Sequence, residues 1–463
     1  MNRKNYLKER SLTDVLKGIL LVLYSAAIYY VWTHYYNPYI PKPLWSLGNY
    51  FIAAIFGAVY LFLAQTYGGF MIGTATVPDL IYSHGICIAL TLTLTYAIFS
   101  LMSYQLVNVI PFIIIFAVFF AFAIIWVFVT DRAYFAVHPP RKTIVVYDRV
   151  DSYLSLRGIK SMDRRFNVIE TLRSRNTDLD TIYKKLLHAD AVFLCGVPAE
   201  YRNEIVKFCI GNNKVAYIKP KISDTIIRGG KTIQLLNVPV YRCTRSNPKL
   251  FYVAGKRFFD IVIGLIGLIV LSPVMLVTAI AIKAYDKGPV LYKQTRLTLN
   301  GKEFKVWKFR SMKVDAEKDG VARLASEDDD RITPVGNIIR KLRIDEIPQI
   351  FNILGGSMTI VGPRPERPEI AAQYEEEMPE FALRLQVKAG LTGYAQVYGK
   401  YNTPPYDKVQ MDLIYVTTQS FIVDLKLILM TVKILFMKES TEGISDGSIT
   451  AQQEIDETTI EDE

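Results

Sequence analysis

Apolar residues fill four long stretches in the first third of the chain, at residues 18–32, 47–64, 81–102 and 107–130. Each stretch nears or reaches the ~20 residues that a helix needs to cross a bilayer. The pattern predicts a four-helix transmembrane bundle over residues 1–135. The first stretch lacks a small-residue cleavage site and is followed by further stretches, so we do not expect a removed signal peptide.

The charges between these stretches predict their orientation. Five basic residues precede the first stretch, whereas Lys42 is the only one in the loop after it. Basic residues return after the fourth stretch at Arg132, Arg141 and Lys142. Because positive residues mark the cytoplasmic side, we expect both ends of the transmembrane block in the cytosol.

Shorter apolar runs separated by polar, helix-permissive segments occupy residues 140–250. Three of them, at 143–147, 191–195 and 215–218, are typical of buried strands. Strands that alternate with helices predict a small parallel sheet, and thus a Rossmann-like α/β domain. A dinucleotide site would require a glycine-rich motif after the first strand, where the sequence is instead Tyr-Asp-Arg-Val at 147–150. We therefore favour a structural or dimerising module.

A fifth apolar run opens the C-terminal domain, which we assign to residues 256–437 with a mixed α/β fold. The run covers residues 257–283, and basic residues flank both of its ends. Ser272 and Pro273 lie at its middle, where proline breaks or kinks a helix. Such a helix can enter and leave by one face if side chains such as Ser272 satisfy the freed backbone groups. We expect a re-entrant helix, because a span would place the rest of the chain outside the cell, away from nucleotide-activated substrates.

The last part of the chain contains two segments of different composition. Residues 421–436 are amphipathic, with Asp424, Lys426 and Lys433 among apolar neighbours, so we expect this helix to lie along the membrane surface. Residues 438–463 are polar and acidic, which predicts a disordered tail.

Composition narrows the classes of partner and cofactor. The net charge of +10 is compatible with attraction to anionic membrane lipid or with phosphate-bearing substrates. Nucleic acid is not expected, since no basic stripe with interleaved aromatic residues stands out. The four cysteines and four histidines are scattered, so a zinc site is not expected either. Any catalytic metal should be a hard ion held by carboxylates and phosphates.

Two basic clusters precede the most informative carboxylates. The run 308–312 carries Lys308 and Arg310, and closely placed cations of this kind can hold a diphosphate, although a basic strand facing lipid headgroups has the same pattern. Arg343 ends a second basic run directly before Asp345 and Glu346. A carboxylate beside cations has its charged form favoured, so it can attack phosphorus. On spacing alone, a solvated charged helix end before Pro348 is the favoured interpretation of the pair.

Two further clusters follow. Pro363, Arg364 and Pro365 belong to a stiff proline-rich loop, which presents a guanidinium with little loss of entropy; an ordinary extended linker is the alternative. In the segment 388–400, glycines bracket a strand-like stretch and permit a ligand to approach the backbone closely.

Taken in this order, the motifs resemble those of the bacterial sugar transferases, the monotopic phosphoglycosyl transferases that prime polysaccharide synthesis. With the preceding apolar stretches and α/β domain, the chain resembles the large subgroup that transfers hexose-1-phosphate to undecaprenyl phosphate. The motifs that carry the resemblance are Lys256-Arg257, Ser272-Pro273, Lys308–Met312, Asp345–Gln349, Val361–Pro365 and Gly390–Gly393.

The resemblance implies a two-step covalent mechanism. Asp345 would be the nucleophile that attacks the β-phosphorus of a UDP-hexose and releases UMP, and undecaprenyl phosphate would then take the phosphosugar. Glu346 would complete the catalytic dyad. The family uses Mg²⁺, for which we expect Asp345 and Glu346 as ligands. Arg343, Lys308 and Arg310 would lie near the substrate phosphates.

The resemblance also implies a cellular location and a set of binding partners. Pro363, Arg364 and Pro365 would bind the uridine nucleotide. We expect the protein in the bacterial plasma (inner) membrane, with the catalytic domain on its cytoplasmic face. A homodimer through the α/β or transmembrane part is compatible with the sequence.

Two departures from the family pattern leave the sugar preference open. Tyr394 stands where members often have Trp, and Lys400 where they often have Arg. A catalytically inactive membrane-anchored regulatory or assembly protein of polysaccharide synthesis is the alternative function, and the intact dyad argues against it. A small-molecule sensor acting through the α/β domain is a third interpretation, which the missing glycine loop weakens.

Overall fold

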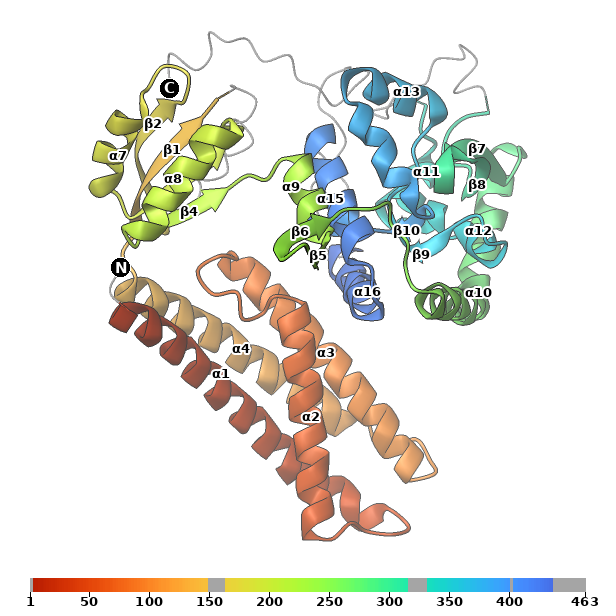
Figure 1. Ribbon diagram of the computed structural model, residues 1–463. Coiled ribbons are helices and arrows are strands. Elements are labelled where there is room, and N and C mark those ends of the chain that lie inside the picture. Colours follow the sequence, from red (N-terminus) through yellow and green to blue (C-terminus); the bar gives the residue numbers. More distant parts are fainter. Residues whose placement is uncertain (1–2, 149–162, 315–330, 400–402, 436–463) are drawn as a thin grey trace. The chain divides into compact units, whose positions relative to one another are not determined.

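The computed structural model describes residues 3–148, 163–314, 331–399 and 403–435, with side chains from residue 14 onward. Within these residues the chain forms two compact units that meet at Lys219 and Pro220 (Figure 1). We call them the N-terminal unit and the C-terminal unit. The acidic tail at 438–463 and Lys400 lie outside the described residues.

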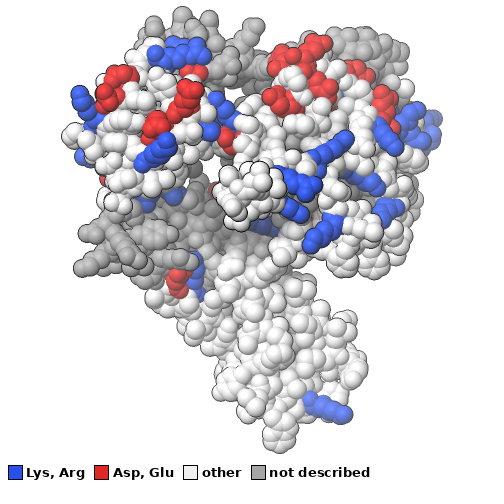
Figure 2. All heavy atoms as spheres, viewed as in Figure 1, with Lys and Arg blue, Asp and Glu red and all other residues white. Residues whose placement is uncertain are grey.

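The N-terminal unit begins with four long helices, as the hydrophobic pattern predicts. They are α1 (Arg3–Val31), α2 (Ser46–Thr66), α3 (Val77–Met102) and α4 (Ile110–Val137), and the short turns η1 (Trp32–Tyr36) and η2 (Asn37–Tyr39) extend α1. Contacts join α1 to α2 and α4, and α3 to the same two helices. All four are long and apolar enough to cross a membrane. Their visible surface is almost free of charged residues (Figure 2).

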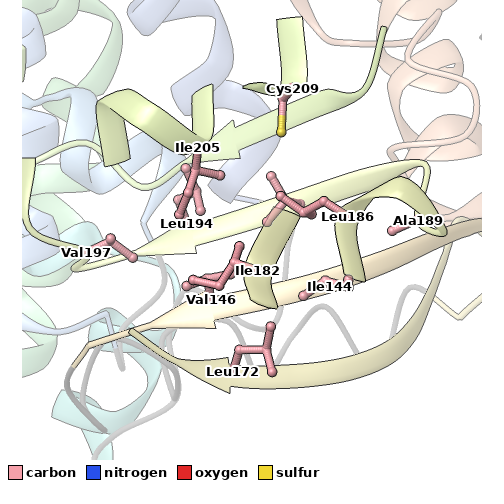
Figure 3. Close-up of a cluster of buried hydrophobic side chains, with 11 residues drawn as sticks. Ile144, Val146, Leu172, Ile182, Leu186, Ala189, Leu194, Val197, Ile205 and Cys209 are labelled. Carbon is pink, nitrogen blue, oxygen red and sulfur yellow. The ribbon is translucent and has the colours of Figure 1, made fainter. Parts of the chain in front are cut away.

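A four-stranded parallel sheet with two helices completes the N-terminal unit. Its elements are β1 (Arg141–Tyr147), β2 (Phe166–Arg173), α7 (Leu179–Leu187), β3 (Ala191–Cys195), α8 (Ala199–Gly211) and β4 (Val215–Ile218). The strand order is β2-β1-β3-β4. Figure 3 shows Ile144 and Leu194 of the sheet facing Ile182 of α7 and Ile205 of α8, all of them buried. The three predicted strands are confirmed, and β2 is an additional one.

The C-terminal unit is a mixed α/β structure in which short strands pack among helices. Its helices are α9 (Ile222–Gly229), α10 (Leu250–Asp286), α11 (Pro334–Lys341), α12 (Gln349–Leu354), α13 (Pro368–Glu377), α14 (Tyr394–Tyr398), α15 (Pro405–Thr418) and α16 (Phe421–Leu435). Its strands form the hairpins β5 (Lys231–Leu235)–β6 (Val238–Arg242) and β7 (Leu291–Leu297)–β8 (Glu303–Phe309), and the parallel pair β9 (Thr359–Val361)–β10 (Gly390–Thr392). The turn η3 (Leu299–Gly301) joins β7 to β8.

The division between the units lies upstream of the boundary that we expected at residue 250. Helix α9 packs on α15, and Ile222 shares a buried cluster with Val409 and Leu413. The Ile222 backbone N–H also donates to the Tyr406 hydroxyl at 3.3 Å. Residues from Pro220 onward therefore belong to the C-terminal unit.

Helix α10 contains the fifth apolar run and is 37 residues long. The sequence predicts a break or kink at Pro273; the helix is not broken there, since it runs from Leu250 to Asp286 with Pro273 inside it. Proline cannot donate to the carbonyl four residues earlier, which is that of Ile269. The Ser272 hydroxyl donates to this Ile269 carbonyl instead, at 2.8 Å. The side chain thus satisfies the group that proline leaves without its backbone partner.

Both halves of α10 contact the C-terminal unit. In the first half, Arg257 donates to the carbonyls of Ile353 and Leu354 at 2.6 and 2.7 Å. A Cβ on Gly264 would lie 3.0 Å from Leu354, so this glycine permits close packing. In the second half, Ile282 is buried with partners on β8 and α11. The 37 residues of α10 correspond to about 55 Å at 1.5 Å per residue. Both ends of this helix are therefore fixed to the rest of the C-terminal unit.

Helix α16 buries two of its charged residues and exposes two of its apolar ones. Asp424 and Lys433 are buried, while Ile422 is 75% exposed and Leu425 46% exposed. Asp424 accepts hydrogen bonds from Tyr252, Lys256 and Tyr415 at 2.7–2.8 Å. Asp424 thus fastens α16 to α10 and α15, and Leu427 is buried in the core, while Ile422 and Leu425 face outward.

Glycine is required where β9 and β10 meet. A Cβ on Gly390 would lie 2.1 Å from the Gly362 backbone nitrogen. We expect Gly390→Ala to lower the free energy of unfolding by about 1–3 kcal/mol, because the backbones must separate. Thermal unfolding in detergent would measure this. Gly211→Ala is the control, since nothing lies within 4 Å of its added Cβ. Equal melting temperatures for the two variants would contradict the close approach.

Candidate active site

The Asp345–Glu346 pair lies on a single short turn, η4 (Ile344–Glu346), between α11 and α12. Arg343 precedes the turn with a φ of 53°, in the left-handed region that non-glycine residues rarely adopt. This residue reverses the chain after α11, so the pair does not continue that helix. Strained backbone of this kind concentrates at functional sites. Contacts with β8 and α11 hold η4 in place.

Three cations surround the Glu346 carboxylate. Its Oε1 accepts from Lys308 Nζ at 3.1 Å and from Arg364 Nη2 at 2.8 Å, and Arg343 lies 3.9 Å from Oε2. Burial alone would raise the pKa of Glu346, but Arg364 and Lys308 outweigh it and hold the pKa well below its usual range. The structure thus brings together Lys308, Arg343 and Arg364, which come from three separate sequence motifs.

Asp345 has a different environment from its neighbour. Burial is the main cause that raises its pKa to about 6, and the charge of Glu346 adds to this rise. Lys308 and Arg340 oppose it. The expectation that adjacent cations keep the carboxylate ionised therefore holds for Glu346, while for Asp345 burial outweighs the cations. Asp345 makes no ion pair with any residue of the described ranges, so its carboxylate is available for chemistry.

The proline-rich loop that carries Arg364 is fixed through its carbonyl groups. Prolines have no N–H to donate, but their carbonyls still need partners. The Pro363 carbonyl accepts from Gly390 N at 2.9 Å, and the Pro365 carbonyl accepts from Arg296 at 3.2 Å. The Arg364 carbonyl accepts from Arg384 at 2.8 Å. Four elements of the C-terminal unit thus hold this loop, because the carbonyls at its two ends are also bonded.

These end contacts come from a tyrosine and from a strand. The Tyr415 hydroxyl donates to the Val361 carbonyl at 2.9 Å, and Leu297 N donates to the Glu366 carbonyl at 2.9 Å. Arg296 also pairs with the Glu366 carboxylate at 3.0 Å. Such a loop presents the Arg364 guanidinium without a large cost in conformational entropy.

A family model described as "Bacterial sugar transferase" matches residues 251–438. The chain is 36% identical over 225 residues to a UDP-glucose:undecaprenyl-phosphate glucose-1-phosphate transferase of Caulobacter vibrioides, covering 48% of the chain and 83% of the relative. The chain belongs to the bacterial sugar transferase family.

Other members of the sugar transferase family differ in length, and their names specify different sugars. A Klebsiella pneumoniae protein with the same name as the Caulobacter one is 35% identical over 272 residues, covering 58% of the chain and 57% of the relative. An Aeromonas hydrophila UDP-N-acetylgalactosamine-undecaprenyl-phosphate N-acetylgalactosaminephosphotransferase is 39% identical over 189 residues, covering 40% and 44%. The match covers 57%, 39% and 54% of the first three curated relatives, so the chain spans about half their length.

Arg310 is not placed with the other cations of the sugar transferase site. Its guanidinium pairs with the Asp286 carboxylate through both Nη atoms, at 2.6 and 2.5 Å. Its Nε donates to the Pro289 carbonyl at 2.7 Å. Because these bonds engage all three guanidinium nitrogens, Arg310 fixes the end of α10 to the end of β8. Ser272 and Pro273 lie within α10 and make their contact there.

Asp345 and Glu346 are not equally suited to bind a Mg²⁺ ion. Mg²⁺ is commonly held by one or two carboxylates together with water and substrate phosphates, so a large ligand cluster is not needed. No group of three metal-binding side chains occurs in the described ranges. Asp345 is open to a cation, whereas Glu346 already accepts from Lys308 and Arg364. Asp345 is therefore the better of the two predicted ligands.

Sequence reasoning missed four polar residues that support the sugar transferase site: Arg296, Arg384, Asp412 and Tyr415. Only Arg296 stood near a recognised cluster, just ahead of the basic run at 308–312. The other three lie in segments without a distinctive local pattern, and only the fold brings them to the proline-rich loop.

The Arg310–Asp286 pair predicts a loss of stability that is separate from substrate binding. Asp286→Ala should lower the free energy of unfolding by about 3 kcal/mol, because it leaves the buried Arg310 charge without a partner. Thermal unfolding would measure the loss. Lys207→Ala removes an exposed pair with Glu204 and should change stability little. If both variants melt alike, the Arg310 pair is not a structural contact.

Proposed function

We propose that the protein transfers hexose-1-phosphate from a UDP-hexose to undecaprenyl phosphate and so initiates polysaccharide synthesis. One observation carries the proposal: an open carboxylate, Asp345, stands beside a carboxylate that three cations hold ionised. The names of the curated relatives agree with this reaction type. These names differ in the hexose that is transferred, and the site residues do not identify the hexose.

In the first step an Asp345 carboxylate oxygen attacks the β-phosphorus of the UDP-hexose. A bond forms between Asp345 and this phosphorus, and the bond from the phosphorus to the bridging oxygen breaks. UMP leaves with the electron pair of that bond. In the second step a phosphate oxygen of undecaprenyl phosphate attacks the same phosphorus and releases the Asp345 carboxylate.

The two carboxylates divide the work because their surroundings differ. The lone pairs of Glu346 Oε1 are engaged by Lys308 and Arg364, which makes it a poor nucleophile. Its fixed charge in turn holds these two cations where the diphosphate must bind. Lys308 and Arg364 can then stabilise the charge that develops on the phosphoryl oxygens and on UMP. A bound Mg²⁺ would supply further neutralisation of that charge.

The C-terminal unit should lie at the cytoplasmic face of the bacterial plasma membrane. Helix α10 is apolar enough to enter a bilayer, yet both of its halves are fixed to one unit. A straight span would separate those contacts across a hydrocarbon core of ~30 Å. Re-entry by one face avoids this, and the outward apolar residues of α16 agree with it. The homodimer and the role of the α/β domain stay predictions.

Asp345→Ala should abolish UMP release, because no other carboxylate in the described site is open to attack phosphorus. The measurement is UMP release by nanodisc-held protein with UDP-hexoses, Mg²⁺ and undecaprenyl phosphate. Glu303→Gln, at an exposed position of β8, is the control and should keep wild-type activity. Full activity in Asp345→Ala would refute the nucleophile assignment. An inactive wild type with every UDP-hexose would favour the regulatory alternative.

The first step should lose rate as the pH falls through about 6. The pKa of Asp345 is raised to about 6, and only its ionised form attacks, so the rate is highest above that pH. Below it the rate should fall about tenfold per pH unit. A single-turnover measurement without undecaprenyl phosphate excludes titration of the lipid phosphate. A rate that stays constant from pH 5 to pH 8 (about one unit below to two above the pKa) would contradict this.

A further inference from the structure

A buried ion pair adjoins the proline-rich loop at the Arg364 carbonyl. Arg384 of η5 (Pro379–Gln386) and Asp412 of α15 approach to 2.7 Å between Nη2 and Oδ2. Their side chains are 8% and 1% exposed. The ring of Phe381 lies 5.0 Å from the Arg384 guanidinium carbon and restricts its plane.

The same nitrogen that meets Asp412 also reaches the loop. Arg384 Nη2 donates to the Arg364 carbonyl at 2.8 Å, and the Arg364 side chain donates to Glu346 at 2.8 Å. A line of polar contacts therefore runs from Asp412 through Arg384 to the backbone of Arg364, and from its guanidinium to the dyad. Within the described ranges, neither Arg384 nor Asp412 hydrogen-bonds to the dyad itself.

Stability is a weak explanation for a pair of this kind. The desolvation of two buried charges offsets most of their attraction, and well-packed apolar residues are often as stable. An apolar pair in their place would leave the Arg364 carbonyl without its donor, and the carbonyl would be free to turn. A fixed position for Arg364 is the property that the ion pair supplies and apolar packing does not.

We propose that Arg384 and Asp412 are positioning residues that hold Arg364 against the diphosphate of the sugar nucleotide. This inference rests on the proposed function. Arg364 would act while the nucleotide is present, which is the first half of the reaction, and UMP has left before the lipid phosphate reacts. Losing the pair should therefore impair the first half-reaction and spare the second.

Steady-state kinetics can separate the two halves, because in a ping-pong reaction kcat/KM for each substrate reports its own half-reaction. Arg384→Lys and Asp412→Asn should lower kcat/KM for the UDP-hexose by roughly 10-fold to 100-fold. The kcat/KM for undecaprenyl phosphate should stay unchanged. A purely structural role would reduce both values equally, through loss of folded enzyme, and would overturn the proposal.

A double-mutant cycle tests whether Arg384 acts through Arg364. In an Arg364→Lys background, Arg384→Lys should cause little further loss in kcat/KM for the UDP-hexose, because the group that it positions is already gone. Independent, additive losses would overturn the proposal. Asp286→Asn is the matched control, since it breaks another Arg–Asp pair of the same unit, and it should lower melting temperature without changing the ratio of the two kcat/KM values.

These experiments distinguish a failure of the positioning role from a failure of the proposed function. If the wild type releases no UMP, or Asp345→Ala releases it at the full rate, the reaction itself is misassigned. If the wild type is active and Asp345→Ala is not, the cycle between Arg384 and Arg364 decides the positioning role by itself.

Discussion

The negative charge of Glu346 is the centre around which the site residues of the C-terminal unit are arranged. A buried carboxylate is tolerated only when cations and hydrogen bonds compensate for its lost hydration. The compensation comes from β8 through Lys308, from the end of α11 through Arg343, and from the proline-rich loop through Arg364. Three segments far apart in the sequence are thereby required to meet. Asp345 occupies the next position on the same turn, so its surroundings are fixed by the same requirement.

The membrane-directed helix is joined to this arrangement by buried polar contacts. Asp260 of α10 accepts from the Thr359 hydroxyl at 2.7 Å and from Ile360 N at 3.0 Å, which ties the helix to β9. Strand β9 leads directly into the loop that presents Arg364. On α16, Asp424 joins Lys256 of α10 to Tyr415, whose hydroxyl also reaches the Val361 carbonyl. The position of α10 in the C-terminal unit and the position of the loop are therefore set by one network.

The sequence predicted the elements that depend on local pattern. The apolar stretches, the strands at 143–147, 191–195 and 215–218, and the dyad with Lys308 and Arg364 could all be found from runs and motifs. Strand β2 was missed because its residues alternate in burial and form no continuous apolar run. The pattern places Lys308 and Arg310 on one face, since residues two apart on a strand point the same way; β8 ends at Phe309, and only the fold shows that Arg310 pairs with Asp286 instead. Asp412 and Arg384 required knowledge of tertiary contacts.

The hydroxyl of Ser272 has a consequence for the transfer of α10 from water into lipid. A backbone carbonyl without a partner costs several kcal/mol in hydrocarbon. Burying one large apolar side chain contributes about 1.5–3 kcal/mol. The hydrogen bond from Ser272 to Ile269 is therefore comparable to one or two leucines in the partition equilibrium of the helix. In the proposed re-entrant placement, a polar atom in the middle of an apolar segment thus acts in favour of insertion.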